Sequence, residues 1–226
     1  MSTFQERLDE IQARIAAACE RAGRPVDDVT LVAVSKTYGP DRVREAAECG
    51  LTLFGENRVQ ELQSKVPMCP SNLEWHLIGT LQRNKVKQVV NLVTMIHSVD
   101  SLKLLEEIDK RTGKIMPVLL QVNVSGEASK SGMAPDEVAG VIEAANQMSN
   151  IEVHGLMTIP PFAVNPDDAR KHFVALRELR DRVQEETGTP LPELSMGMSG
   201  DFEVAIEEGA TFVRVGSSLF GARDYK

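Results

Sequence analysis

The chain has 226 residues, 42% of them hydrophobic, which suits one globular domain with a sizeable core. Its formal net charge of -8 argues against a nucleic-acid backbone or an anionic membrane as the main partner. Because it has no long apolar stretch and no signal-peptide pattern, we expect a cytoplasmic protein. Cys19, Cys49 and Cys69 are scattered and the histidines lack ligand spacing, so we expect no disulfide framework and no metal site.

The N-terminus is predicted to form an amphipathic helix, because Phe4, Leu8, Ile11, Ile15 and Ala18 recur at helical spacing. A Gly-Arg-Pro segment ends this helix. Apolar runs typical of strands then alternate with helical patterns. The strand-like runs are 29–34, 51–54, 75–78, 94–97, 116–124, 151–156, 194–196 and 212–215. The helical patterns are 41–49, 58–65, 82–91, 102–111, 135–148, 167–187 and 202–208.

Eight strands in alternation with helices predict an α/β protein with a (β/α)8 TIM barrel, preceded by the extra N-terminal helix. An open, doubly wound sheet has the same alternation and is the main alternative. No stretch has the composition of a linker between domains, so we expect a single domain over 1–226.

Lys36 ends the first strand-like run, and a Gly-Pro turn follows it closely. In barrels and parallel sheets, ligands collect at the carboxyl ends of the strands. A lysine held in an apolar wall there loses its proton more readily, because burial disfavours the ammonium form, and a neutral amine can form a Schiff base. A surface lysine at a strand-loop junction is the alternative, and it agrees with the usual exposure of lysine.

Two consecutive loops near the C-terminus are rich in glycine and serine, and they follow the seventh and eighth strand-like runs. Small residues let backbone N–H groups approach an anion closely. In barrels these two loops frequently bind a phosphate group. Ordinary strand-to-helix turns are the alternative. The candidate phosphate-binding residues are Ser199, Gly200, Gly216, Ser217 and Ser218.

Arg214 lies inside the last strand-like run, where an arginine is costly unless it is paired. It could offer a planar set of donors to a ring nitrogen or a carboxylate, or it could pair with an acidic side chain of a neighbouring strand. Strand alternation puts Arg214 on one face with Phe212 and Gly216, and Val213 and Val215 on the other. The pattern does not decide which face is the barrel interior.

An amine after the first strand, a phosphate site after the last two strands and an arginine between them suggest a pyridoxal phosphate site. A set of motifs runs in order along nearly the whole chain: VAVSK at 32–36, FGENRVQE at 54–61, WHLIGTLQRNK at 75–85, QVNV at 121–124, SKSG at 129–132, GLMTIP at 155–160, SMGMS at 195–199 and FGAR at 220–223. With these motifs the sequence closely resembles the pyridoxal phosphate homeostasis protein family, also known as alanine racemase N-terminal-domain-like or proline synthetase co-transcribed homologues. One departure is Thr80, where many relatives carry proline.

The resemblance implies a (β/α)8 barrel that carries pyridoxal 5'-phosphate on Lys36 as an internal aldimine. It also implies phosphate contacts from the loops at 199–200 and 216–217, and Arg214 facing the pyridine nitrogen.

Three further residues fall on motifs that line the cofactor mouth in relatives, namely Asn57, His76 and Met157. A hydrogen-bonded strand histidine is an equal alternative for His76, and a core position is an equal alternative for Met157. Lys130 would be a second amine for taking up or releasing the cofactor, although a solvated loop lysine is the simpler interpretation.

The resemblance implies binding more than turnover. An arginine at the pyridine nitrogen keeps that nitrogen unprotonated, which makes the ring a poor electron sink. Alanine racemases add a β domain and a tyrosine base contributed across a dimer interface. We expect neither here, because the chain ends at Lys226, just after the eighth barrel unit, and its tyrosines are Tyr38 and Tyr225.

We therefore expect a monomeric carrier without robust catalytic activity. It would buffer pyridoxal phosphate or deliver it to apoenzymes, and so affect amino-acid and keto-acid balance. A pyridoxal phosphate-dependent amino-acid racemase is the first alternative. A barrel enzyme that uses Lys36 as a Schiff-base nucleophile on a small phosphorylated substrate is the second.

Overall fold

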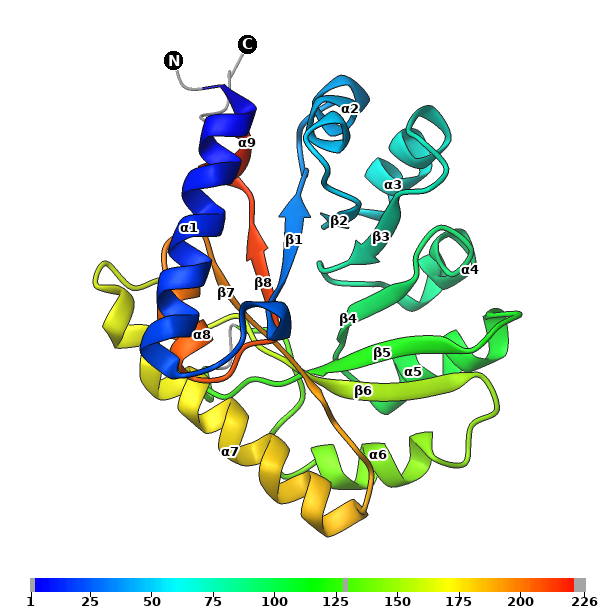
Figure 1. Ribbon diagram of the computed structural model, residues 1–226. Coiled ribbons are helices and arrows are strands. Elements are labelled where there is room, and N and C mark those ends of the chain that lie inside the picture. The colour runs from blue at the N-terminus through cyan, green and yellow to red at the C-terminus, as the bar shows by residue number, and fades with distance from the viewer. Residues whose placement is uncertain (1–2, 128–129, 222–226) are drawn as a thin grey trace.

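The computed structural model of the protein describes residues 3–127 and 130–221. Eight parallel strands follow one another around a closed barrel, and β8 pairs with β1 to complete it (Figure 1). The closed ring confirms the predicted (β/α)8 barrel and excludes the open sheet. The strands are β1 (Thr30–Val34), β2 (Leu53–Glu56), β3 (Glu74–Leu77), β4 (Met95–Val99), β5 (Met116–Gln121), β6 (Ile151–Met157), β7 (Glu193–Met198) and β8 (Phe212–Val215).

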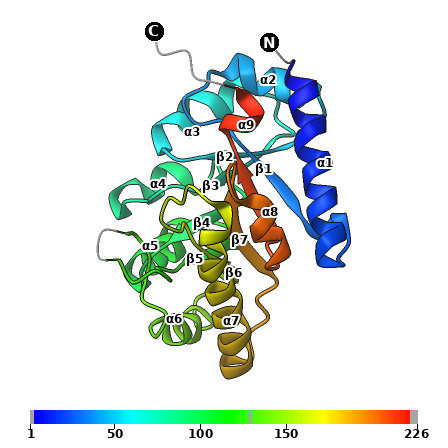
Figure 2. The same ribbon diagram turned by 90° about the vertical axis from the view of Figure 1, so that its left-hand side faces the viewer.

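The helices lie outside the ring of strands (Figures 1 and 2). They are α1 (Phe4–Ala22), α2 (Pro40–Glu48), α3 (Val59–Lys65), α4 (Val86–Val89), α5 (Leu102–Arg111), α6 (Val138–Ala145), α7 (Arg170–Thr187), α8 (Phe202–Glu207) and α9 (Ser217–Phe220). The helix predicted at 82–91 is shorter than expected, because its start is a 3-10 turn and its interior is rich in β-branched valine. In the described part of the chain, no helix is long and apolar enough to span a membrane.

Two layers of apolar side chains result from strand alternation. Val213 and Val215 point outward into the large core between strands and helices. Phe212 and Arg214 therefore face the barrel interior, which decides the question that the sequence left open. The inner cluster, as we call the apolar filling of the barrel, consists of Val32, Met95, Leu119, Met157 and Phe212.

The predicted N-terminal helix is present as α1, and it packs against the last two helices of the barrel, α8 and α9. A capping box between Thr3 and Glu6 starts the helix, and Gly23, with a φ of 65°, ends it. The helix runs along α8, and its first turns reach α9 (Figures 1 and 2). There the Nε of Arg7 donates a 2.7 Å hydrogen bond to the carbonyl oxygen of Leu219. The N-terminal helix thus helps to hold α9 in place.

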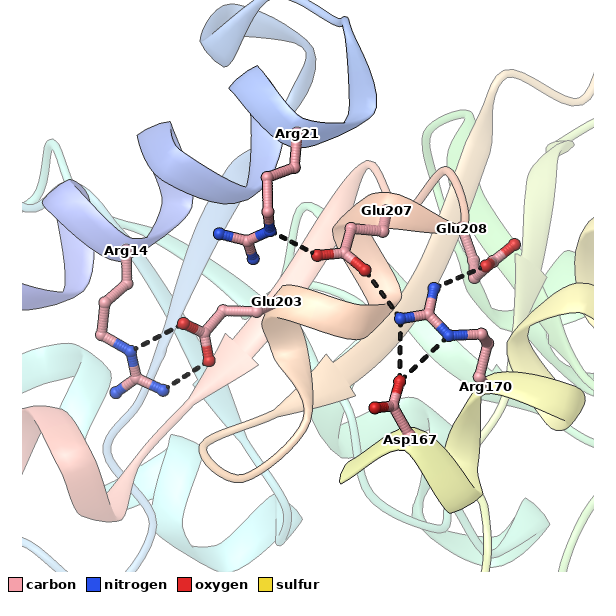
Figure 3. A network of polar contacts seen from close by, with 7 residues as sticks. All are labelled: Arg14, Arg21, Asp167, Arg170, Glu203, Glu207 and Glu208. Atoms are coloured by element: carbon pink, nitrogen blue, oxygen red, sulfur yellow. Dashed lines mark hydrogen bonds and ion pairs between the residues drawn. The ribbon is translucent and has the colours of Figure 1, made fainter. Parts of the chain in front are cut away.

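Ion pairs fasten the same helices on the outside of the barrel (Figure 3). The Nε and Nη2 atoms of Arg14 on α1 donate to the two carboxylate oxygens of Glu203 on α8, at 3.2 and 2.8 Å. Glu207 of α8 lies between Arg21 of α1 and Arg170 of α7, at 2.7 Å from each. Because these side chains are partly exposed, each pair contributes only modestly to stability. Their joint effect is to fix the position of α8.

Candidate functional site

A cavity of about 790 Å³ lies at the carboxyl ends of the strands, which is the usual place and size for a small-molecule site in a barrel. Residues that end or follow β1, β2, β3, β5, β6, β7 and β8 line it. It brings together seven of the residues predicted from the sequence: Lys36, Asn57, Ser199, Gly200, Arg214, Gly216 and Ser217.

Lys36 lies in the turn directly after β1, where it is half-buried. Before it, the buried Ser35 hydroxyl donates a 2.6 Å hydrogen bond to Oε1 of Glu56. After it, Thr37 has a φ of 71°, a left-handed conformation that is strained for a β-branched residue. The N–H of Thr37 donates to Oε2 of Glu61 at 2.8 Å. Two carboxylates therefore hold the residues on either side of the lysine, one through the Ser35 hydroxyl and the other through the Thr37 backbone.

The two predicted phosphate loops meet at one side chain. Ser199 Oγ accepts hydrogen bonds from the backbone N–H groups of Gly216, at 3.2 Å, and Ser218, at 3.5 Å. Gly216 also lies against β1, because a Cβ atom there would be 3.2 Å from the carbonyl oxygen of Val34. The loops after β7 and β8 thus form one wall of the cavity beside the strand that leads to Lys36. Ser218 contacts Ser199 through its backbone N–H and does not itself line the cavity.

Arg214 is 4% exposed and reaches the cavity from β8. It donates to Ser195 Oγ at 2.6 Å and to the carbonyl oxygen of Thr158 at 2.9 Å. Burial lowers the pKa of this guanidinium to about 10, although the charge of Asp201 opposes that shift. Within residues 3–127 and 130–221 no carboxylate forms an ion pair with it. The geometry therefore favours the cavity-facing donor over an ion pair between strands.

The cavity wall carries far more positive than negative charge. Among the described residues that line it, four are basic and one, Asp201, is acidic. The basic residues are Lys36, Arg58, Lys130 and Arg214. The Asp201 carboxylate accepts a 2.6 Å hydrogen bond from the backbone N–H of Met198, and burial raises its pKa. In a protein with a formal charge of -8, this local excess of positive charge favours an anionic ligand.

Besides Ser218, two predicted site residues do not line the cavity. His76 is 5% exposed, and its Nδ1 lies 2.9 Å from Nε2 of His97. Burial lowers the pKa of His76 to about 4. Met157 is fully buried in the inner cluster. The structure thus places His76 as a hydrogen-bonded strand histidine and Met157 as a core residue, the two alternatives named above.

Some residues that line the cavity were not expected from the sequence. Gln121 ends β5, and the rule that ligands collect at strand ends would have found it. The loop after β6 contributes Phe162, which is 92% exposed. Lys130, which the sequence suggested as a second amine, also lines the cavity. Its segment lies against the end of β5, because the N–H of Met133 donates to the carbonyl oxygen of Gln121 at 2.9 Å. Of the family motifs, Ser129, Ala222 and Arg223 lie outside the described residues, as does Tyr225.

The described residues contain no group of three or more His, Cys, Asp or Glu side chains that could hold a metal ion.

The hydroxyl of Tyr38 donates to the carbonyl oxygen of Gly221 at 2.7 Å, and its ring stacks on Phe220. Tyr38 is thus part of the packing of α9 and does not line the cavity.

Comparison with known proteins agrees with the fold. The family model for the N-terminal domain of alanine racemase matches residues 7–224. Among curated relatives, the pyridoxal phosphate homeostasis protein of Aquifex aeolicus is 50% identical over 97% of this chain and 98% of its own length. The namesake from Pseudomonas aeruginosa is 44% identical over 100% of this chain and 98% of its own. The chain belongs to the pyridoxal phosphate homeostasis protein family, as the sequence motifs indicated.

A solved structure agrees with this assignment. PipY of Synechococcus elongatus, solved with pyridoxal phosphate bound, is 35% identical and superposes with a TM-score of 0.84. The alignment covers 97% of this chain and 100% of PipY.

Proposed function

We propose that this protein binds pyridoxal 5'-phosphate through a covalent bond to the Lys36 amine, and that it buffers or delivers the cofactor. One observation carries the proposal: Lys36, Arg214 and the loops at 199–200 and 216–217 line a single cavity. These groups match the three reactive or polar parts of the cofactor, which are its aldehyde, its ring nitrogen and its phosphate. The pyridoxal phosphate-bound PipY structure supports the same assignment.

The described residues fit the cofactor chemically. Arg214 has five N–H donors, of which Ser195 and Thr158 take two, so it can donate to a ring nitrogen. The wall joined by Ser199 also includes Ser217, and both hydroxyl groups can donate to a phosphate, because Ser199 Oγ only accepts in its contact with the backbone N–H of Gly216. The cofactor supplies a reactive aldehyde, which explains why a protein would hold it on an amine. We assign no contact with the cofactor to His76 and Met157. Both side chains fill the barrel interior.

The cavity supports a carrier more than a racemase. Racemisation needs an acid and a base on opposite sides of the substrate carbon. The titratable side chains that line the cavity in the described chain are basic groups and Asp201, whose carboxylate is bound to Met198 N–H. The Tyr38 hydroxyl donates to the carbonyl oxygen of Gly221. We further propose a monomer that acts in the cytoplasm and gives its cofactor to apoenzymes, with effects on amino-acid and keto-acid balance.

Absorbance spectroscopy with a matched lysine control tests the binding. Wild-type protein and Lys87→Ala, which alters an exposed lysine of α4, should hold pyridoxal phosphate with a yellow absorbance band. Lys36→Ala should lose that band. If Lys36→Ala held covalent cofactor at full stoichiometry, the assignment of the attachment site would be wrong.

Exchange of the amino-acid α-hydrogen for solvent deuterium separates the carrier from the racemase. The loaded protein should show no exchange above the rate of free pyridoxal phosphate. Exchange that depends on Lys36 and exceeds this rate would support the racemase. Transfer to an apoenzyme, measured as recovered activity, should proceed with the wild-type protein as the only cofactor source.

A further inference from the structure

A row of four polar side chains crosses the barrel interior from the cavity to the opposite strands. Arg214 of β8 contacts Ser195 of β7 at 2.6 Å, and Ser195 contacts Nδ1 of His97 on β4 at 2.9 Å. His97 Nε2 then contacts Nδ1 of His76 on β3, also at 2.9 Å. The four residues are between 0% and 5% exposed. We call them the interior row.

The hydrogen-bond directions in the interior row follow from one fixed end. A guanidinium has donors only, so Ser195 Oγ accepts from Arg214. Ser195 Oγ could accept a second hydrogen bond, but among its described contacts Nδ1 of His97 is the only group that can take the hydroxyl proton. Nδ1 of His97 therefore accepts from Ser195. His97 therefore carries its proton on Nε2 and donates it to Nδ1 of His76. Both imidazoles are consequently neutral Nε2–H tautomers, an assignment made from the network of contacts.

The surroundings agree with neutral imidazoles. Burial lowers the pKa of His76 to about 4 and that of His97 well below its ordinary value, and the neighbouring Arg214 charge adds to the shift of His97. The ring of Phe212 lies against both imidazoles, with centroid distances of 5.7 and 5.2 Å. Arg214 is thus the single cation of the row.

Filling the barrel interior with polar side chains costs desolvation free energy. Barrel interiors are usually packed with apolar side chains, and the inner cluster does so here. Desolvation of two imidazoles, a hydroxyl and a guanidinium is tolerated only when each finds a partner. The row ends at the buried guanidinium that lines the cavity, and the carbonyl oxygen of Thr158 holds its other terminal nitrogen at 2.9 Å.

We propose that His97, supported by His76, is a positioning residue that acts through Ser195 to fix the Arg214 guanidinium for the ring of the ligand. Its imidazole commits the Ser195 hydroxyl proton, which leaves the Ser195 lone pairs for Arg214. The ligand in this statement is the cofactor of the proposed function, but the orientation of Arg214 is a property of the protein alone.

Two substitutions of His97 distinguish this role from simple packing. His97→Asn puts an amide oxygen near the place of Nδ1 and can still accept from Ser195. His97→Gln puts an amide nitrogen near the place of Nε2 and loses the acceptor close to the backbone. Ser195→Ala removes the acceptor of Arg214 directly, and it serves if His97→Gln does not fold. His154→Gln, at the half-exposed histidine of β6, is the control.

The first measurement is 15N NMR of the protein without cofactor. Wild-type protein, His97→Asn and His154→Gln should show slow rotation of the Arg214 guanidinium, with separate Nη signals. His97→Gln and Ser195→Ala should average these signals. In the wild type, His97 and His76 should show unprotonated Nδ1 atoms. A protonated Nδ1 on His97, or slow rotation retained in both disrupting variants, would overturn the proposal.

The second measurement is the dissociation constant and absorption spectrum of bound pyridoxal phosphate. His97→Gln and Ser195→Ala should weaken binding about tenfold, the effect of one lost hydrogen bond, and shift the absorption band. His97→Asn should keep the affinity and the absorption band of the wild type. Unchanged affinity and spectrum in the disrupting variants would contradict the positioning role. If the wild type bound no pyridoxal phosphate, the proposed function would fail, and the NMR result would still decide the orientation of Arg214.

Discussion

The Nζ of Lys65 lies 2.8 Å from the backbone carbonyl oxygen of Ser35, the residue that precedes Lys36. The same ammonium lies 2.6 Å from Oε1 of Glu56 and 2.8 Å from Oε2 of Glu61. Glu56 accepts from the Ser35 hydroxyl, and Glu61 accepts from the backbone N–H that follows Lys36. A buried lysine of α3 thus organises the turn that presents the lysine of the cavity.

Removal of Lys65 should damage this turn. Lys65→Met leaves Glu56 buried without its cation, and Glu56 Oε2 already has no hydrogen-bond partner in the described part of the chain. We expect a loss of about 3 kcal/mol in the free energy of unfolding, measured with urea. Adding Glu56→Gln should recover part of that loss. Lys87→Met, on the surface, should change stability by less than about 0.5 kcal/mol. A Lys65→Met effect as small as this control would contradict the account.

The Glu56 carboxyl should make stability depend on pH. Burial raises its pKa to about 7 from an ordinary 4.5, while Lys65 and the Ser35 hydroxyl oppose the shift. Its contribution is therefore fully present below pH 4.5 and is lost as the pH rises through 7. The stability of wild type relative to Glu56→Gln should fall between pH 4.5 and 7. Urea unfolding across this range measures the difference, and a rise with pH would show that the pKa is lowered.

The interior histidine His76 should act in the opposite direction. Its pKa is lowered to about 4 by burial, so between pH 6.5 and 4 the unfolded chain binds a proton that the folded chain does not. Its contribution is present above pH 6.5 and is lost as the pH falls towards 4. The stability of wild type relative to His76→Asn should therefore decrease as the pH falls from 6.5 to 4. A difference that does not vary with pH would mean that His76 is protonated equally in both states.

A glycine pair tests how closely the loops are packed at the cavity. A Cβ atom on Gly79 would lie 2.4 Å from the carbonyl oxygen of Asn57, whereas one on Gly39 would meet nothing within 4 Å. Gly79→Ala should therefore cost about 2 kcal/mol of stability and weaken pyridoxal phosphate binding. Gly39→Ala should leave both unchanged within error. Thermal unfolding and cofactor titration check the pair, and equal effects would contradict the close packing.

The barrel and much of the site could be predicted from local patterns. Lys36, Ser199 and Gly216 follow strands, and strand ends meet at one end of a parallel barrel. The inward face of β8 could not be predicted, because alternation is symmetric until packing assigns Val213 to the outer core and Arg214 to the interior.

Contacts between distant residues were also beyond the sequence. His76 and His97 are 21 positions apart, and only the closure of the barrel brings both towards Ser195. Lys65 looks in sequence like any helical lysine, and its burial depends on Glu56 at the end of β2. Such pairs arise from the tertiary structure, since no local periodicity links their members.

Borohydride reduction of the protein loaded with pyridoxal phosphate, followed by peptide mass mapping, tests the central claim most directly. Reduction makes the covalent bond permanent, so the modified peptide reports the attachment site. The account predicts one pyridoxyl phosphate group per chain, on Lys36. Modification mainly at Lys130 or another lysine, or no stoichiometric modification, would contradict it.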